Sequence, residues 1–140
     1  IARYLGRISG PLLDRIDMQL EVTAVPVRQI TESAPEEPSA DIHKRVQAAR
    51  ERQQKRYAGE GISCNAELSA RQLETFCPLD DACRELLGKA CDTYHLSMRA
   101  VSRVRKVART IADLAGAEEI GRAHLLEALR YRNLEGNYWK

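Results

Sequence analysis

The feature that most constrains this chain is a series of amphipathic segments between residues 69 and 131, separated by short connections. Apolar residues recur there at spacings of three and four, the period of an α-helix with one buried face. Ser69, Asp80 and Ser97 stand where helices would begin, and Gln72 follows Ser69 with the spacing of a capping box. Four such helices joined by short turns predict an all-α fold, a small helical bundle.

The composition agrees with a helical core. The 140 residues are 44% apolar but only 5% aromatic, so Leu, Ile, Val and Ala must fill the core. No stretch approaches the ~18 to 20 uncharged apolar residues of a membrane-spanning helix, so no membrane partner is expected. Four cysteines without C-x-x-C spacing, together with the lack of a signal peptide, predict reduced structural thiols, no metal site and a cytoplasmic location.

Turn and cap residues predict where the helices end. A first short helix should stop at Pro78, and the helix that begins at Ser97 should reach Ala115 and end at Gly116. The last helix should run from about Arg122 to Tyr131. In the last three helices, the positions predicted to face the core are Cys83, Leu86, Leu87, Ala90, Cys91, Tyr94, Met98, Val101, Val104, Ala108, Ile111, Ala115, Ala123, Leu126 and Leu129.

The region before this bundle has a different character. Residues 1–25 show a turn at residues 9–11, a short helix and then an alternating strand pattern of apolar residues. A single strand has no sheet to join, so we expect a largely unstructured N-terminal segment. The apolar positions of the alternating pattern are Met18, Leu20 and Val22.

A proline-rich linker at residues 26–40 precedes a basic helix. Ser39 or Asp41 is expected to cap this helix, which should run to about Tyr57. Residues 41–58 hold six Lys or Arg against two acids, although the net charge of the whole chain is only +2. The sequence therefore predicts three parts: residues 1–25, a linker with one basic helix at residues 26–62, and a helical domain at residues 63–140.

Basic residues on the helix that begins after Ser97 are the first candidates for chemistry. The plain interpretation of such a run is a solvated face, and the sharper one is a surface that binds phosphate on a nucleotide or a nucleic acid. Arg99 is distinctive because it lies in the first turn, where unpaired amides and the helix dipole also favour an anion. The five cations are Arg99, Arg103, Arg105, Lys106 and Arg109.

Arg15 is the second candidate, because it lies at the junction of the short helix and the strand pattern. A guanidinium that projects from such a junction could stabilise charge on a phosphoryl group in a neighbouring subunit. The plainer alternative is a salt bridge from Arg15 to Asp14 or Asp17.

Other chemistry has little support in the sequence. The three histidines, His43, His95 and His124, accompany no recognisable nucleophile elbow. The one Gly-Lys step, at residues 88–89, lies inside a helical pattern and lacks the spacing of a phosphate loop. No nucleotide hydrolysis is expected from this chain alone.

Three stretches carry a resemblance to a known family. Residues 9–17 (SGPLLDRID) resemble the end of the ATPase core in AAA+ proteins of the magnesium-chelatase-like branch. Residues 96–114 resemble the second sensor helix of that family, and residues 124–132 resemble its closing helix. The chain thereby resembles the C-terminal region of the magnesium-chelatase-related, ComM-type AAA+ ATPases.

The resemblance implies that this is part of a longer protein, as a start at Ile1 rather than methionine also suggests. An upstream core would bind ATP and Mg²⁺ and assemble as a ring, a hexamer, with residues 63–140 as the lid over the nucleotide. Arg15 matches the arginine finger acting in trans, and Arg99 matches the sensor-2 arginine on the ATP phosphates, with Arg103 as its support. ComM-type proteins are associated with DNA uptake and recombination, as a helicase or branch-migration motor.

Two alternatives stay open. One is the motor subunit of magnesium chelatase, which drives metal insertion into a porphyrin. The other is a stand-alone DNA-binding module, because a helix ending near Tyr94, a tight turn and a basic helix from Met98 have helix-turn-helix spacing.

Overall fold

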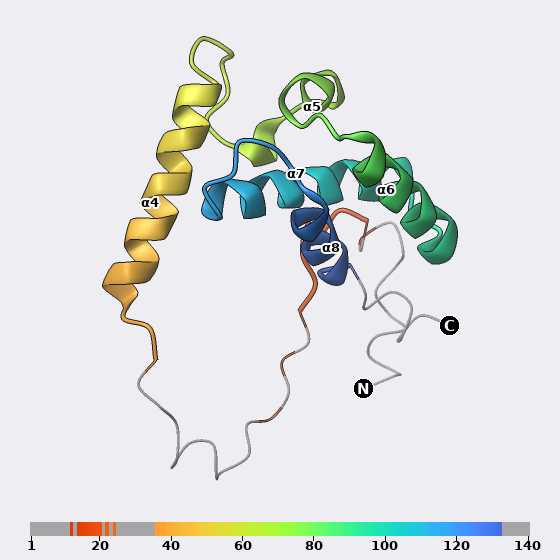
Figure 1. The fold of residues 1–140 in the computed structure, drawn as a ribbon, viewed down its shortest axis with the longest axis horizontal. Helices are drawn as coiled ribbons and strands as arrows, with labels where there is room; N and C mark the ends of the chain where they lie inside the picture. The colour runs from red at the N-terminus through yellow and green to blue at the C-terminus, as the bar shows by residue number, and fades with distance from the viewer. Residues whose placement is uncertain (1–11, 13, 21, 23, 25–35, 133–140) are drawn as a thin grey trace.

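The computed structural model describes residues 12, 14–20, 22, 24 and 36–132. The predicted turn at residues 9–11 and most of the predicted linker lie outside these ranges. Within them the chain is helical and has no strand, so the predicted all-α class is confirmed (Figure 1). No helix in these ranges is long and apolar enough to cross a membrane. The elements are α4 (Ser39–Arg56), the short 3-10 helix η1 (Asn65–Glu67), α5 (Ala70–Phe76), α6 (Asp81–Tyr94), α7 (Met98–Leu114) and α8 (Arg122–Arg130).

Helix α7 is the centre of the bundle. It contacts α4, η1, α5 and α8, while α6 packs against α8 (Figure 1). Val104, Ala108 and Ala112 of α7 are buried against Leu125 and Ala128 of α8. Small alanines on both helices allow close approach, and each larger aliphatic side chain contributes roughly 1.5–3 kcal/mol by leaving water.

Three predicted helix starts are confirmed. The backbone N–H of Gln72 donates to Ser69 Oγ at 3.3 Å, and the N–H of Ser69 donates to Gln72 Oε1 at 3.0 Å. Asp80 accepts from the Cys83 N–H at 2.7 Å, and Ser97 accepts from the Ala100 N–H at 3.1 Å. These bonds satisfy amides that a helix N-terminus leaves unpaired.

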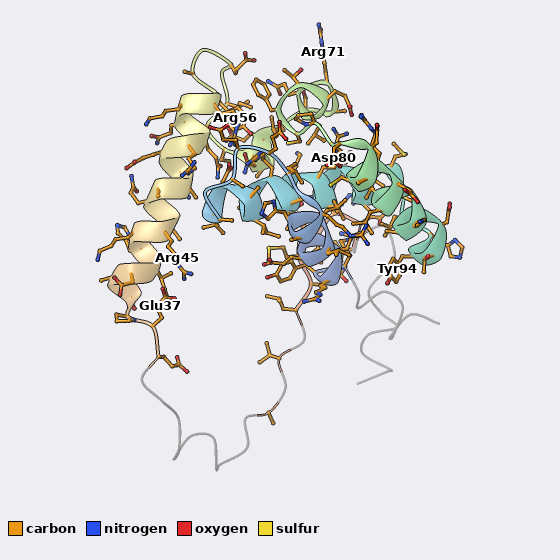
Figure 2. All side chains as sticks on the ribbon, viewed as in Figure 1. Glu37, Arg45, Arg56, Arg71, Asp80 and Tyr94 are labelled. Atoms are coloured by element: carbon orange, nitrogen blue, oxygen red, sulfur yellow. The ribbon has the colours of Figure 1, made fainter. Side chains whose placement is uncertain are left out.

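The predicted cap of α4 is wrong, because Pro38 precedes the helix and no side chain caps it. Ala49 and Tyr57 are buried, whereas Ile42 and Val46 are each 43% exposed. Only the C-terminal part of α4 adjoins the bundle. Figure 2 shows Arg56 at that end of the helix, with Glu37 and Arg45 at the opposite end.

The predicted buried face is also wrong in part. In α8 the buried residues are Leu125 and Ala128, while Ala123 and Leu126 are exposed. Apolar residues occupy most of this short helix, and contact with α7 selects a face one position away from the predicted one. At the helix ends, where neighbouring helices no longer cover them, Tyr94, Met98 and Ala115 are also exposed.

Residues 14–20 lie against the bundle, and their alternating pattern forms no strand. Met18, Leu20 and Val22 are exposed, because the described part of the chain offers no second strand to pair with. The segment instead makes single contacts, such as the hydrogen bond from the Gln19 N–H to the Tyr131 carbonyl at 2.8 Å. The division of the chain at residues 25 and 62 stays a prediction.

Candidate functional site

The N-terminus of α7 presents Arg99 in its first turn. Ser97 caps the helix, and the turn at His95, whose φ of 51° is left-handed, sets the direction from α6 into α7. The Arg99 side chain is exposed. Because the positive end of the helix dipole lies here, a phosphate bound by Arg99 would be further stabilised by roughly 0.3–1 kcal/mol at an exposed site.

Arg15 is the second exposed guanidinium. Its backbone N–H donates to the Leu12 carbonyl at 3.0 Å, which forms a turn that carries the side chain outward. Within the described ranges, neither Arg15 nor Arg99 has a side-chain hydrogen bond or ion pair. The salt bridge considered for Arg15 is therefore not formed, because Asp14 and Asp17 contact other residues.

Arg103 lies one turn after Arg99 and pairs with Asp17. The Arg103 side chain is 25% exposed and that of Asp17 is 48% exposed, so the pair is partly shielded from water. Arg103 therefore reaches from α7 to the segment that carries Arg15, and not to open solvent.

The other three cations of α7 are held inside the chain, which corrects the prediction of a continuous basic face. Arg105 donates to the carbonyls of Leu73 and Cys77 at 3.0 and 2.9 Å, where α5 ends. Lys106 Nζ donates to the Ala66 carbonyl at 2.8 Å. Arg109 donates to two carbonyls of the loop before α8 at 2.8 Å each. These side chains organise neighbouring backbone and leave Arg99 as the exposed cation of α7.

A buried polar network joins α4 to α7. Asp113 accepts from Arg56 Nη1 at 2.9 Å and from Asn65 Nδ2 at 2.9 Å, and it pairs with Arg109 at 3.2 Å. Tyr57 OH donates to Asn65 Oδ1 at 2.6 Å. The hydrogen bond to Asp113 raises the pKa of Arg56, while burial lowers the pKa of Arg109. This network is structural, and its one sequence signal is the i,i+4 spacing of Arg109 and Asp113.

Histidines and cysteines form no catalytic set in the described residues. His124 Nδ1 accepts from the Gly121 N–H at 3.0 Å and so caps α8, while His43 and His95 are exposed. Cys77 and Cys83 are fully buried free thiols, and burial raises the pKa of each to about 11. No group of three metal-ligating side chains occurs within the described ranges.

Comparison with known proteins places these features in a family. The model of the magnesium chelatase subunit ChlI C-terminal domain matches residues 36–132, and the model of magnesium chelatase subunit ChlI matches residues 1–30. The chain therefore belongs to the magnesium chelatase ChlI C-terminal family, a branch of the AAA+ proteins. This finding confirms the resemblance to the magnesium-chelatase-related, ComM-type group.

Curated relatives match almost the whole chain. Competence protein ComM of Haemophilus influenzae is 43% identical over 133 residues, which is 94% of this chain and 25% of the relative. The YifB protein of Escherichia coli is 42% identical over 134 residues, 95% of this chain and 26% of the relative. A Mycobacterium tuberculosis protein is 35% identical over 93% of this chain and 26% of the relative. The chain thus spans about a quarter of the length of these relatives.

Proposed function

We propose that this chain is the lid and sensor-2 region of a ring-forming AAA+ ATPase, a cytoplasmic hexamer whose upstream core binds ATP and Mg²⁺. The observation that carries the proposal is the selective exposure of Arg99. Three later cations of α7 are bound internally, while Arg99 is exposed at the N-terminus of the helix. A guanidinium beside free helix amides suits the terminal phosphates of ATP.

In this proposal the two exposed arginines act on different nucleotides. Arg99 contacts the phosphates of the ATP bound by its own subunit, and Arg103, one turn further along α7, supports it without contacting the nucleotide itself. Arg15 contacts the ATP of the adjacent subunit as an arginine finger, where its charge stabilises the transferring phosphoryl group. Loss of phosphate would release Arg99 and allow the lid to move against the core, which couples hydrolysis to remodelling.

DNA is the substrate that we propose, with the ATPase as a helicase or branch-migration motor in DNA uptake and recombination. Support comes from the 43% identity to a protein named for competence. The family names equally support a second candidate, the magnesium chelatase motor that serves metal insertion into a porphyrin. A stand-alone helix-turn-helix module has no such support, because α7 lies among α4, α5 and α8 and is not exposed as a recognition helix.

The test is steady-state ATP turnover by the full-length protein. Arg15→Ala and Arg99→Ala should each lower turnover by at least about a hundredfold, in line with the contribution of arginine fingers elsewhere. Arg71→Ala is the matched control, because Arg71 is an exposed arginine that points outward from α5 and should leave turnover unchanged (Figure 2). Wild-type turnover in both Arg15→Ala and Arg99→Ala would refute the proposal. Whether branched DNA or chelatase partner proteins stimulate ATP turnover distinguishes the DNA motor from the chelatase motor.

A further inference from the structure

The segment that carries Arg15 is fastened to the helical bundle at four successive points. Ser97 Oγ donates to Asp14 Oδ2 at 2.8 Å, and Arg132 Nη1 donates to the Ile16 carbonyl at 2.6 Å. Asp17 pairs with Arg103. The Gln19 N–H donates to the Tyr131 carbonyl at 2.8 Å. Both neighbours of Arg15 are therefore bound to the bundle, while the Arg15 side chain is exposed.

The four contacts differ in their burial and in whether they involve backbone or side-chain atoms. Arg132 is 4% exposed and binds backbone, so it fixes the path of the segment as part of the packed structure. Asp17 and Arg103 are joined through their side chains alone, at the rim of the bundle. A partly exposed pair of this kind contributes little to stability. Asp17 and Arg103 can therefore be substituted without unfolding the bundle.

The N-terminal part of α7 positions both Arg99 and the turn that carries Arg15. Ser97 caps the helix that presents Arg99, and its hydroxyl also binds Asp14, the residue before Arg15. Arg103 follows Arg99 by one helical turn and binds Asp17, two residues after Arg15. A shift of the α7 N-terminus therefore carries the Arg15 turn with it, since both of its flanks are attached to that helix.

Building on the proposed function, we infer that Asp17 and Arg103 are positioning residues that lock the arginine finger to the lid. Arg99 contacts the phosphates of one ATP. When those phosphates change, the α7 N-terminus shifts, and the Asp17–Arg103 pair transmits this shift to Arg15 at the next ATP. Each subunit would then couple two neighbouring nucleotide sites of the ring through this ion pair. Arg103 acts in this scheme through Asp17, without touching nucleotide.

Charge exchange in the full-length ATPase tests the inference. Asp17→Arg and Arg103→Asp each place like charges together, and each should lower kcat by about tenfold to a hundredfold, because a small misplacement of a reacting group has that effect. The dissociation constant for ATP should change by less than about twofold, since neither residue binds substrate. The double exchange, Asp17→Arg with Arg103→Asp, should restore kcat to within about threefold of wild type.

Glu85 and Lys89 provide the matched control. They form an exposed ion pair of 2.6 Å on α6, so Glu85→Lys and Lys89→Glu should leave kcat unchanged. Wild-type kcat in both single variants would overturn the inference. So would a double variant that does not recover kcat, provided that it unfolds at the same urea concentration as the wild type.

Arg15→Ala in the same assay separates the positioning role of Asp17 and Arg103 from the proposed role of Arg15. If Arg15→Ala lowers turnover and the exchanges do not, the locking role fails while the proposed function stands. If Arg15→Ala keeps wild-type turnover, the finger role itself fails.

Discussion

Arg109 and Asp113 form an ion pair of 3.2 Å one turn apart on α7, and the structure buries both side chains. A second guanidinium, that of Arg56 on α4, binds the same carboxylate. One buried carboxylate thus compensates charge from two helices, and Asn65 fills its remaining hydrogen-bonding capacity. Such a network is costly to break, because any remaining charge stays buried without a partner.

Asp113→Asn should therefore destabilise the chain severely. Removing the carboxylate charge leaves Arg109 buried beside a neutral amide, and we expect a loss of about 3 to 5 kcal/mol in the free energy of unfolding. Urea denaturation followed by circular dichroism measures this change. Glu85→Gln, which breaks an exposed pair, is the control and should shift stability by less than about 0.5 kcal/mol. Equal effects of the two variants would show that the network does not join α4 to α7.

Arg105→Met should lower the stability of the chain, because Arg105 has a structural role and is not a nucleotide contact. The Arg105 side chain is 13% exposed and donates to the carbonyls of Leu73 and Cys77 where α5 ends. The Leu73 carbonyl keeps a hydrogen bond from the Cys77 N–H, so the loss of Arg105 leaves the Cys77 carbonyl without this donor, at a cost of about 1 to 3 kcal/mol. The exposed Arg99→Met should change stability by less than about 0.5 kcal/mol. Urea denaturation of both variants tests this contrast, and a larger loss for Arg99→Met would contradict the assignment of the α7 cations.

Stability should fall at alkaline pH. Burial raises the pKa of Cys77 from 9.0 to about 11 in the folded chain, so the unfolded chain releases this proton first. The stabilising effect of the neutral thiol is complete below pH 9 and is lost as the pH rises toward 11, by up to about 3 kcal/mol. Burial also raises the pKa of Tyr57, which acts in the same direction. Urea midpoints between pH 8 and 11 should fall less steeply in Cys77→Ala, and an unchanged slope would contradict the prediction.

The isolated 140-residue chain should bind duplex DNA weakly. Three of the five cations on α7 are held by backbone carbonyls and Arg103 is paired, so α7, the recognition helix of the DNA-binding alternative, keeps few cations to displace counterions from DNA. Fluorescence anisotropy against salt concentration measures the number of phosphates contacted. Tight binding with a slope of about five or more would instead revive the DNA-binding module as the function.

Local signals predicted the helices well. The side chains of Ser69, Asp80 and Ser97 bind amides within three residues of themselves, and those contacts depend on nothing distant. Periodicity likewise placed Val104 and Ala108 in the core. Prediction was weaker in α8, where apolar residues on several sides leave the choice of buried face to contact with α7.

The candidate site required information from distant parts of the chain. The run of five cations after Ser97 predicted a basic face, but in the structure Arg103 pairs with Asp17 and Lys106 donates to the Ala66 carbonyl. Those partners are far away in sequence, and no periodicity could reveal them. Pairing of Arg15 with Asp14 or Asp17 was the simplest local alternative. Ser97 and Arg103 of the bundle bind those two carboxylates instead.

Mixing two inactive full-length variants tests the central claim most directly. If Arg99 acts on its own subunit's ATP and Arg15 on its neighbour's, Arg15→Ala and Arg99→Ala rings should each be nearly inactive. Rings assembled from equal amounts of both should regain about a quarter of wild-type ATP turnover, because a quarter of the head-to-tail interfaces then hold both arginines. No recovery in mixed rings, or wild-type turnover in either single variant, would contradict the account.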